Sequence, residues 1–561
     1  MRTSKYPLVS RARSCLLAAC LSAAAHGAPD APPLVKLERP VPAWLATAVC
    51  YQIYPQSFAD TNGDGIGDLR GIIAKLDYVK SLGVDAIWLN PIYDSPFGDA
   101  GYDVRDYKRV ASRYGTNADA KLLFAEAHKR GIRVVVDLVA GHTSVEHPWF
   151  KDSCRQNRPA KPDFYIWSPP DSNNGDFVAG PGPRDGKYLK NFFPFQPALN
   201  YGYGRPNPGR PWEKLPSDPN CVAVREAMRD VMKFWLDQGC DGFRVDMAAS
   251  LIKNDDGKAL TALWQDYRTW LKRYKPEAVL VSEWSNPSKA IPAGFDIDFL
   301  IHFESPAYRL LMNPVLNREN ANHSFFSVDG TGDITAFLAE YLPQYEKTKT
   351  LGFISLPTGN HDFSRPRFQG REIPDLKVVY AMLLTMPGVP FIYYGDEIGM
   401  RNLKGWPDKE GAMWRGSCRS PMQWSADANA GFSTASADKL YLPLDPDPKR
   451  PNVADEVRDP DSLLHFTRQL IALRHKHPSL GSLGGFKPLY ARKNTYPFVY
   501  LRSGGPENFL IAVNPSHAAT ECEVPELDGA KRVASSGAET NGTNLKMGPA
   551  SYAIYRTQAT R

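Results

Sequence analysis

The 561-residue sequence lacks the features that mark membrane-spanning, zinc-binding and nucleic-acid-binding proteins. After its first 28 residues it has no apolar run near the ~20 residues that a spanning helix requires. Its eight cysteines include no Cys-x-x-Cys pair, which argues against a zinc site. The formal charge is +6, and no block of Lys or Arg concentrates it, so nucleic-acid binding gains no support. We therefore expect neither a transmembrane segment nor a nucleic-acid partner.

The first 28 residues have the order of a secretory signal peptide. An apolar run at 15–25 follows four basic residues, and small residues lead to an expected cleavage after Gly27 or Ala28. We therefore predict export to the periplasm or the extracellular space, where disulfides are permitted. The second interpretation is a lipoprotein attached through Cys20, because residues 17–20 resemble a bacterial lipobox, although the apolar stretch before Cys20 is short.

Eight apolar runs with strand character alternate with amphipathic helical patterns. The strand candidates cover residues 48–55, 85–91, 133–139, 242–246, 278–283, 295–299, 352–356 and 390–395. The helical patterns cover residues 69–82, 118–130, 222–238, 260–274, 333–345 and 375–386. Repeated strand–helix alternation indicates an α/β fold with a parallel sheet, and eight units predict a (β/α)8 TIM barrel. A doubly wound open sheet is the alternative, because periodicity alone does not separate the two.

Two segments do not follow this alternation. Roughly 80 residues between the third strand candidate and the helix at 222 are rich in Pro, Gly, Asn and aromatic residues, and a structureless loop of that length is improbable in a compact domain. After a final helix at 461–475, short alternating runs indicate an antiparallel β-sandwich. The expected organisation is a leader at 1–28, barrel parts at 45–142 and 219–478, an inserted small domain at 143–218 and a C-terminal β-sandwich at 479–561.

Carboxylates stand at the ends of three strand candidates. Asp246 and Glu283 each close one, and Asp362 follows a third by six residues. Each alone is more often a cap or a surface charge, but the strand ends of a barrel share one face, where the three would meet. Cleavage of a glycosidic bond requires such a set, with one carboxylate at the cationic carbon and one protonated carboxyl at the leaving oxygen. Arg244 shares a strand face with Asp246 and would keep it ionised.

Together the segments resemble the signatures of the α-amylase superfamily, glycoside hydrolase family 13. The matching segments are Asp-Leu-Val-Ala-Gly-His at 137–142, Gly-Phe-Arg-Val-Asp at 242–246, Glu283-Trp284, Asn-His-Asp at 360–362 and Gly-Asp-Glu-Ile-Gly at 395–399. The resemblance covers about residues 45–475 and implies a retaining enzyme that forms a covalent glucosyl intermediate. By motif position, it implies Asp246 as the nucleophile, Glu283 as the general acid/base and Asp362 as the transition-state stabiliser.

The resemblance also implies a set of substrate-binding residues, namely Tyr102, Asp103, His142, Arg244, His361, Arg365 and Arg419. Segments 51–58, 101–103 and 419–424 resemble the oligo-1,6-glucosidase and α-glucosidase branch, whose members act mainly on short oligosaccharides from the non-reducing end. We therefore expect an α-glucosidase with an oligosaccharide substrate. The alternatives are an endo-acting α-amylase, a transglucosylase of the trehalose synthase or sucrose-acting type and, more remotely, a non-catalytic family member that serves as a binding subunit.

Three residues depart from the pattern of the branch. Ala198 stands where the branch usually has Asp, and Gly141 stands where the first signature usually has Asn. In α-amylases that Asn is a calcium ligand, so the α-amylase type of calcium site is not expected. Met247, directly after the implied nucleophile, matches neither the α-1,4 nor the α-1,6 specialists, and the linkage preference stays open.

A different metal site is predicted at 60–68, where oxygen-bearing residues alternate as in the first part of an EF-hand loop. The twelfth position is Gly71, so the bidentate Glu of an EF-hand is missing. The glucosidase branch carries such a loop after its first strand, and we expect a structural Ca²⁺, with Mg²⁺ as the alternative ion and a solvated turn as the alternative structure. The predicted ligands are Asp60, Asn62, Asp64, Asp68 and the carbonyl of Ile66.

Overall fold

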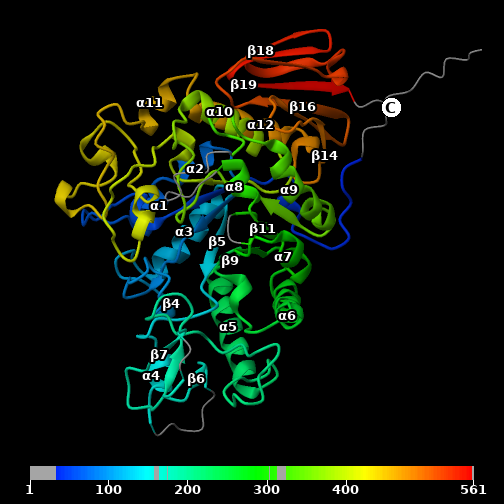
Figure 1. Ribbon diagram of the computed structural model, residues 1–561. Helices are drawn as coiled ribbons and strands as arrows, with labels where there is room; N and C mark the ends of the chain where they lie inside the picture. Colours follow the sequence, from blue (N-terminus) through cyan, green and yellow to red (C-terminus); the bar gives the residue numbers. More distant parts are fainter. Residues whose placement is uncertain (1–32, 157–162, 173–174, 302–303, 313–323, 559–561) are drawn as a thin grey trace, which may run out of the picture.

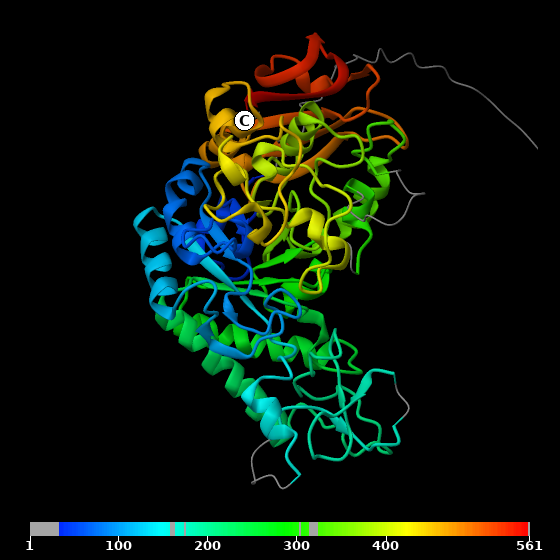
Figure 2. The same ribbon diagram turned by 90° about the vertical axis from the view of Figure 1, so that its left-hand side faces the viewer.

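The computed structural model describes residues 33–156, 163–172, 175–301, 304–312 and 324–558. The predicted signal peptide and Cys20 lie outside these ranges. Figure 1 shows a central barrel with a β-domain at one end and a smaller inserted segment at the opposite end. The turned view of Figure 2 keeps the same order, so the barrel separates the two smaller parts.

Eight short parallel strands form the barrel, in the order β12-β11-β10-β9-β5-β2-β1-β13. Their residues are almost entirely buried, because helices cover the outer face. The strands are β1 Cys50–Ile53, β2 Ala86–Leu89, β5 Arg133–Leu138, β9 Gly242–Val245, β10 Val279–Ser282, β11 Ile297–Phe299, β12 Phe353–Ser355 and β13 Phe391–Tyr393.

The sheet closes on itself. The last strand, β13, pairs with the first, β1. Between β12 and β13, Val389 N donates to Ile354 O at 3.2 Å and Thr358 N donates to Phe391 O at 2.9 Å. An open doubly wound sheet would leave two separate edges, so these contacts exclude it and confirm the TIM-barrel prediction.

Helices surround the barrel and follow its strands along the chain. They are α1 Leu69–Ala74, α2 Leu76–Ser81, α3 Asn117–Lys129, α5 Pro219–Gln238, α6 Lys258–Tyr274, α7 Pro287–Ala293, α8 Ala307–Met312, α9 Ile334–Thr348, α10 Ile373–Leu383, α11 Val453–Arg458 and α12 Leu463–Lys476. Local sequence defines their ends: Thr116 and Asp119 form a capping box before α3, and Gly239 ends α5 in the left-handed conformation. The helix expected over 69–82 is divided at Lys75.

The segment between β5 and α5 forms a small structure beyond the carboxyl ends of the barrel strands. It contains α4 Pro148–Ser153 and a three-stranded sheet of β6 Trp167–Ser168, β8 Lys187–Leu189 and β7 Phe177–Ala179. Phe150, Trp167 and Tyr188 stack in its interior. An antiparallel bridge between His142 and Ala198 ties both ends of the segment to the end of β5. A hairpin of β3 Tyr93–Asp94 and β4 Asp106–Val110 extends from the preceding unit.

The C-terminal part is an antiparallel sheet of six strands, β14 Gly485–Tyr490, β15 Phe498–Ser503, β16 Glu507–Asn514, β17 Thr520–Glu523, β18 Lys531–Asn541 and β19 Asn544–Gln558. The buried Arg502 of β15 joins it to the barrel. Arg502 Nη1 donates to Thr385 O, and its Nη2 donates to Gly481 O at 2.6 Å.

The cysteines of the described residues are all buried, and Cys50, Cys221, Cys240, Cys418 and Cys522 are free thiols. Burial raises the pKa of Cys240 to about 12, so this thiol stays protonated and unreactive at neutral pH. None of the described helices combines the length and apolar character that crossing a membrane requires.

Candidate active site

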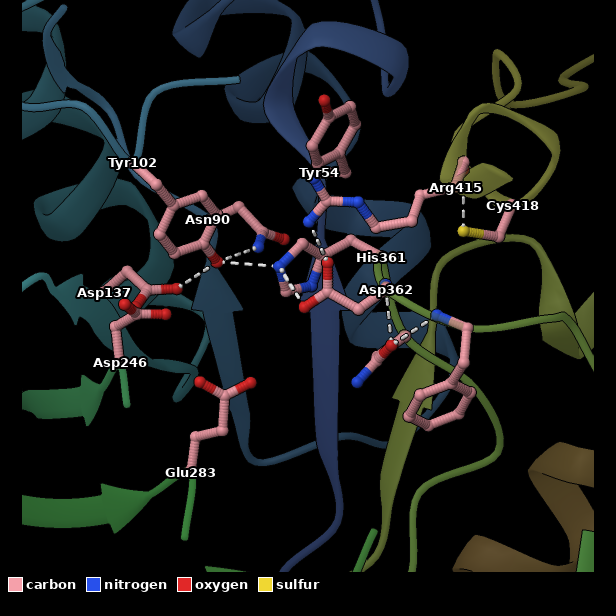
Figure 3. Close-up of polar contacts among 12 residues, drawn as sticks. Tyr54, Asn90, Tyr102, Asp137, Asp246, Glu283, His361, Asp362, Arg415 and Cys418 are labelled. Atoms are coloured by element: carbon pink, nitrogen blue, oxygen red, sulfur yellow. Dashed lines mark hydrogen bonds and ion pairs between the residues drawn. The ribbon is translucent and has the colours of Figure 1, made fainter. Parts of the chain in front are cut away.

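The barrel ladder places two carboxylates on neighbouring strand ends. Asp246 directly follows β9 and its N–H donates to Leu138 O at 3.1 Å, while Glu283 directly follows β10 and its N–H donates to Val245 O at 3.1 Å. These bonds extend the pairing of β5, β9 and β10 by one residue. Figure 3 shows both side chains rising from adjacent strands, with His361 and Asp362 across from them.

Arg244 connects the carboxylates of three adjacent strands. Its Nη1 lies 2.9 Å from Asp137 Oδ1 and 3.0 Å from Asp246 Oδ1, and its Nη2 lies 2.7 Å from Glu283 Oε1. Arg244 is 1% exposed, so the contacts lie in a medium of low dielectric constant. One fixed cation therefore balances three buried acids, and at least one proton is expected to remain among them.

The buried acids differ in how strongly they retain a proton. Burial, together with the charges of Asp246 and Asp362, raises the pKa of Glu283 to about 8 despite Arg244. Burial also raises the pKa of Asp246 to about 7, against the effect of Arg244. The two groups share Arg244, so ionisation of one disfavours ionisation of the other, and the pair is expected to hold one proton near neutral pH. One carboxylate beside one protonated carboxyl is the combination that a nucleophile and a general acid require.

Asp362 has the opposite electrostatic environment. Burial alone would raise its pKa, but the cations Arg415 and Arg419 hold it well below the usual range. Arg415 Nη1 lies 2.8 Å from Asp362 Oδ1, and Arg419 Nη2 lies 3.2 Å from the same oxygen. Asp362 is therefore ionised at every pH at which the protein would act, and it faces the coupled pair as a permanent anion.

A hydrogen-bond network connects Asp137 to Asp362 and fixes the orientation of the side chains between them. Tyr102 Oη donates to Asp137 Oδ2 at 2.9 Å and lies 2.8 Å from His361 Nε2. The side-chain amide of Gln52 donates to His361 Nδ1 at 3.0 Å, which places the ring proton on Nε2, 3.1 Å from Asp362 Oδ2. Burial lowers the pKa of His361 well below its usual value, so the ring is neutral. Figure 3 shows the part of this network that connects Asp137, Tyr102, His361 and Asp362.

His142 is held by the inserted segment. Its Nε2 donates to Tyr102 O at 3.1 Å, and Asn191 Nδ2 donates to its Nδ1 at 2.9 Å. The absence of a side chain at Gly141 makes room for Asn191, because a Cβ at position 141 would lie 3.1 Å from Asn191 Nδ2. The unexpected glycine in the first signature and the inserted segment are therefore physically linked.

These groups line one cavity of about 470 Å³. Its wall consists of Asp99, Tyr102, His142, Phe192, Asp246, Met247, Ala249, Ser250, Glu283, Trp284, Glu304, Asp362, Met413, Trp414 and Arg415. The three implied catalytic acids, Asp246, Glu283 and Asp362, thus line the same cavity.

Met247 also lies on the cavity wall. Its backbone is in the left-handed region, with φ 44°, and its N–H donates to Glu283 Oε2 at 3.0 Å. This unfavourable backbone conformation directs the Met247 N–H at the carboxyl group of Glu283.

Five of the implied substrate-binding residues are not among those that line the cavity, namely Asp103, Arg244, His361, Arg365 and Arg419. Arg244 and His361 contact the carboxyl groups of cavity residues. The carboxylate of Asp103 accepts bonds from Gly98 N, Asp99 N and the Ser95 hydroxyl, so it organises its own loop. The side chain of Arg365 pairs with Asp396 at 2.8 Å and is fully buried. Arg419 lies behind Asp362 and also donates to His361 O at 2.7 Å. The contacts that the structure gives these five side chains are with the protein itself, and their implied contact with substrate stays a prediction.

Asp99 and Arg415 are among the cavity residues that sequence reasoning missed. They form an ion pair of 3.2 Å on the cavity wall, and Arg415 also contacts Asp362. Asp99 stands only four residues before Asp103. The sequence did not indicate which of the two carboxylates faces the cavity, because this depends on the conformation of the loop. Arg415 lies in a 3-10 segment, Met413–Cys418, just before the quoted 419–424 block. Ala198, where an Asp was expected, is fully buried and contributes no carboxylate.

The loop at 60–68 is held by its own backbone amides. Asp60 Oδ2 accepts from Gly65 N at 2.8 Å, and Asp64 Oδ1 accepts from Ile66 N at 2.8 Å. Asp68 caps α1 by accepting from Gly71 N at 2.7 Å. Within the described ranges, no three His, Cys, Asp or Glu side chains are grouped as metal ligands. The oxygen donors suit Ca²⁺ by type, and the metal site stays a prediction.

Comparison with known proteins agrees with the fold and the cavity. The family profile described as "Alpha amylase, catalytic domain" matches residues 52–482. The oligo-1,6-glucosidase of Parageobacillus thermoglucosidasius is 33% identical over 549 residues, covering 86% of this chain and 92% of that protein. The trehalose synthase/amylase TreS of Mycobacterium tuberculosis is 33% identical over 525 residues, covering 84% and 82%. The solved structure of isomaltulose synthase from Erwinia rhapontici NX5 has a TM-score of 0.77 and 27% identity, covering 92% of this chain and 100% of that chain.

The barrel, the acids at its strand ends and these matches establish that the chain belongs to the α-amylase family, glycoside hydrolase family 13. Within the family it is an α-glucosidase-like glycoside hydrolase, most similar in type to the oligo-1,6-glucosidase branch. The expected superfamily, branch and enzyme class are confirmed, and the non-catalytic alternative gains no support.

Proposed function

We propose that the protein removes terminal glucosyl residues from short α-glucosides with retention of configuration. The observation that carries this proposal is the sharing of Arg244 by Asp246 and Glu283 on the wall of one cavity. Two buried carboxyl groups with raised pKa values, sharing one cation, match the two-carboxylate mechanism of retaining glycosidases.

In this mechanism Glu283 donates its proton to the glycosidic oxygen, and that bond to the anomeric carbon breaks. Asp246 forms a bond to the same carbon, and the leaving alcohol carries away the proton. Glu283, now ionised, takes a proton from water, whose oxygen displaces Asp246 and restores both residues. Asp362, held as an anion by Arg415, stabilises the cationic character of the ring in each transition state.

Three variants and one stereochemical measurement test the assignment. Asp246→Asn and Glu283→Gln should each lower kcat on maltose by about 1,000-fold or more, with an unchanged circular dichroism spectrum. Asp237→Asn, an exposed partner of Lys233, is the matched control and should retain activity. The first product seen by NMR should be α-glucose. Initial release of β-glucose, or near-normal activity of either active-site variant, would contradict the proposal.

Transglucosylation is the second candidate, supported by the trehalose synthase and isomaltulose synthase among the similar proteins. Both outcomes use the same glucosyl intermediate and differ in the acceptor that reaches it. Product analysis with maltose, isomaltose, sucrose, trehalose and starch separates the two. Isomerised or elongated products in place of free glucose would favour transfer, and oligosaccharides released from starch would favour endo action.

The predicted metal and export features are part of the proposal. Asp60, Asn62, Asp64, Asp68 and the Ile66 carbonyl would hold a structural Ca²⁺ that stabilises the loop after β1. The loop packs tightly, because a Cβ at Gly65 would lie 2.1 Å from Lys439 O. Cleavage after Gly27 or Ala28 would export the enzyme, and mass spectrometry of the mature N-terminus distinguishes this from a lipid at Cys20.

A further inference from the structure

A buried carboxyl group on β11 lies beside the acid of the proposed mechanism but outside the cavity. Asp298 is fully buried and is not among the residues that line the cavity. The ladder between β10 and β11 ends at the pair of Ser282 and Asp298, and Glu283 is the next residue of the chain. Asp298 therefore lies at the point where β10 ends and the chain delivers Glu283 to the active site.

The side chain of Asp298 accepts hydrogen bonds from residues on both sides of Glu283. Ser282 Oγ donates to Asp298 Oδ1 at 2.5 Å, and Trp284 N donates to the same oxygen at 3.1 Å. Asn286 N donates to Oδ2 at 2.9 Å. The two backbone N–H groups lie beyond the last pair of β10 and β11, so the Asp298 carboxyl takes the place of a strand partner for them.

These hydrogen bonds stabilise a carboxylate that burial disfavours. In all three, Asp298 is the acceptor, and both of its oxygens accept, as they do in the ionised form. Burial acts in the opposite direction and raises the pKa of Asp298 to about 8, although the hydrogen bonds lower it. Loss of the carboxyl would leave buried N–H groups without partners, which costs more free energy than an ordinary hydrogen bond contributes.

The turn that Asp298 holds contains a strained residue. Ser285 is fully buried and has a backbone φ of 61°, in the left-handed region that a non-glycine residue seldom occupies. Such a conformation persists only where neighbouring contacts determine it. The bonds from Trp284 N and Asn286 N to Asp298, on either side of Ser285, supply these contacts. Without them the turn would relax and move the adjacent backbone of Glu283.

The opposite side of Glu283 is fixed by β9 and the loop that follows it. Glu283 N donates to Val245 O at 3.1 Å, and Glu283 O accepts from Ala248 N at 3.2 Å. The backbone of the acid is therefore held from two neighbouring strands. On the β9 side the main chain makes the contacts, whereas on the β11 side the side chain of Asp298 makes them. A single substitution can remove the second set.

We infer that Asp298 is a positioning residue for the general acid/base, which places the Glu283 carboxyl at the glycosidic oxygen. The inference rests on the proposed function, in which Glu283 donates its proton to the leaving alcohol. A displaced Glu283 slows proton donation and the later activation of water, but it leaves attack by Asp246 unaffected. Asp298 therefore matters most for substrates whose leaving group needs a proton.

The test compares maltose with α-D-glucosyl fluoride, whose leaving group departs as fluoride ion without the proton that an alcohol requires. Asp298→Asn should lower kcat/KM for maltose about tenfold or more, and that for the fluoride less than about threefold. Glu283→Gln should show the same selective loss to a larger extent. Circular dichroism checks that both variants fold.

Asp296→Asn is the matched control, because Asp296 is also fully buried and directly precedes β11. Its carboxylate accepts from Leu280 N at 3.0 Å and pairs with Arg268 at 2.6 Å, both away from Glu283. This variant should lower the melting temperature and leave the ratio of the two kcat/KM values unchanged. It thus separates a general loss of stability from a loss of acid placement.

Azide gives a second measurement, because it attacks the glucosyl intermediate without help from a base. Its terminal nitrogen bonds to the anomeric carbon as the bond from that carbon to Asp246 breaks, so α-D-glucosyl azide forms. With glucosyl fluoride as the substrate, azide should raise kcat of Asp298→Asn and Glu283→Gln about twofold or more. The unmutated enzyme should show no such increase.

An equal loss on maltose and glucosyl fluoride in Asp298→Asn, or no loss on either, would overturn the inference. If Glu283→Gln keeps its selective loss in that case, the proposed function stands. If Glu283→Gln shows no selectivity, the acid assignment of the proposed function fails instead. Where Asp298→Asn does not fold, Ser282→Ala removes one of the three contacts without changing charge. It should lower the maltose-to-fluoride ratio about threefold, and an unchanged ratio would count against the role of Asp298.

Discussion

Arg244 and Glu283 are in direct buried contact, with Nη2 of the arginine 2.7 Å from Oε1 of the acid. The other terminal nitrogen of Arg244, Nη1, contacts Asp246. The same cation therefore stabilises the ionised forms of Asp246 and Glu283. Loss of a proton from one carboxyl makes ionisation of the other less favourable. This coupling lets one residue stay protonated while its neighbour is a carboxylate, which double displacement requires.

Replacing Arg244 by Lys should lower kcat/KM about 100-fold or more, because one ammonium group does not bridge Asp137, Asp246 and Glu283 as a planar guanidinium does. Steady-state kinetics measure the effect, and circular dichroism checks folding. Arg130→Lys is the control, since Arg130 bonds to the exposed Asp77 on the surface. Activity of Arg244→Lys within twofold of the parent would show that the bridge is dispensable.

Glu283→Gln should stabilise the protein increasingly as the pH rises from about 5 to 8. The pKa of Glu283 rises from the ordinary 4.5 to about 8 because the group is buried. Between these values the unfolded chain releases a proton that the folded chain retains, so the free energy of unfolding falls with pH. Gln does not titrate, so the free energy of unfolding of Glu283→Gln does not fall with pH for this reason.

Melting temperatures of the parent and Glu283→Gln at pH 5, 6, 7 and 8 check this prediction. The difference should grow with pH and reach about 2 °C or more at pH 8. Glu539→Gln, at an exposed position on β18, controls for a general effect of removing a negative charge. A constant or shrinking difference would mean that Glu283 is not protonated in the folded enzyme near neutral pH.

Arg415 and Arg365 should respond differently to replacement by Met. Arg415 holds the pKa of Asp362 low, so Arg415→Met should raise that pKa and move the acidic limb of the pH profile of kcat/KM upward. Arg365→Met leaves Asp396 buried without its cation and should lower the melting temperature, with a smaller effect on KM. An unchanged pH profile for Arg415→Met would contradict the first expectation.

Gly141→Asn should impair activity at least tenfold, because the new side chain competes with Asn191 for the same space and displaces it from His142. The double variant Gly141→Asn with Asn191→Gly should recover part of the loss, since the space is then free. Kinetics of both single variants and the double variant form a cycle that measures the coupling. Additive effects would show that the two positions are independent.

Chelation should lower the melting temperature if the 60–68 loop binds Ca²⁺, because a metal that binds only the folded state stabilises it. Dialysis against EDTA, followed by addition of Ca²⁺ or Mg²⁺, measures the shift and the ion preference. Asp64→Asn should reduce the response, while Asp528→Asn in the C-terminal part should not. A melting temperature unaffected by EDTA, with no bound metal by elemental analysis, would support the solvated turn.

Several features of the site depended on loop conformation that no local pattern specifies. Asp99 and Asp103 lie in one short run, and only the folded loop turns the first toward the cavity and the second toward its own backbone. Arg415 approaches Asp99 across more than 300 residues of chain, a pairing without any local signal. Arg365 is predicted to bind substrate, and only the folded structure shows that its side chain is buried against Asp396.

The amino-acid sequence by itself determined the eight strand–helix units and the acids at the strand ends, because hydrophobic periodicity and strand-end position are local properties. Asp246 and Glu283 were therefore identifiable before their surroundings were known. The tertiary structure alone decided which polar groups share Arg244, how Asn191 uses the space at Gly141, and how Asp99 and Arg415 come together on the cavity wall. Those relationships arise from packing between distant segments, whose geometry depends on closure of the whole barrel.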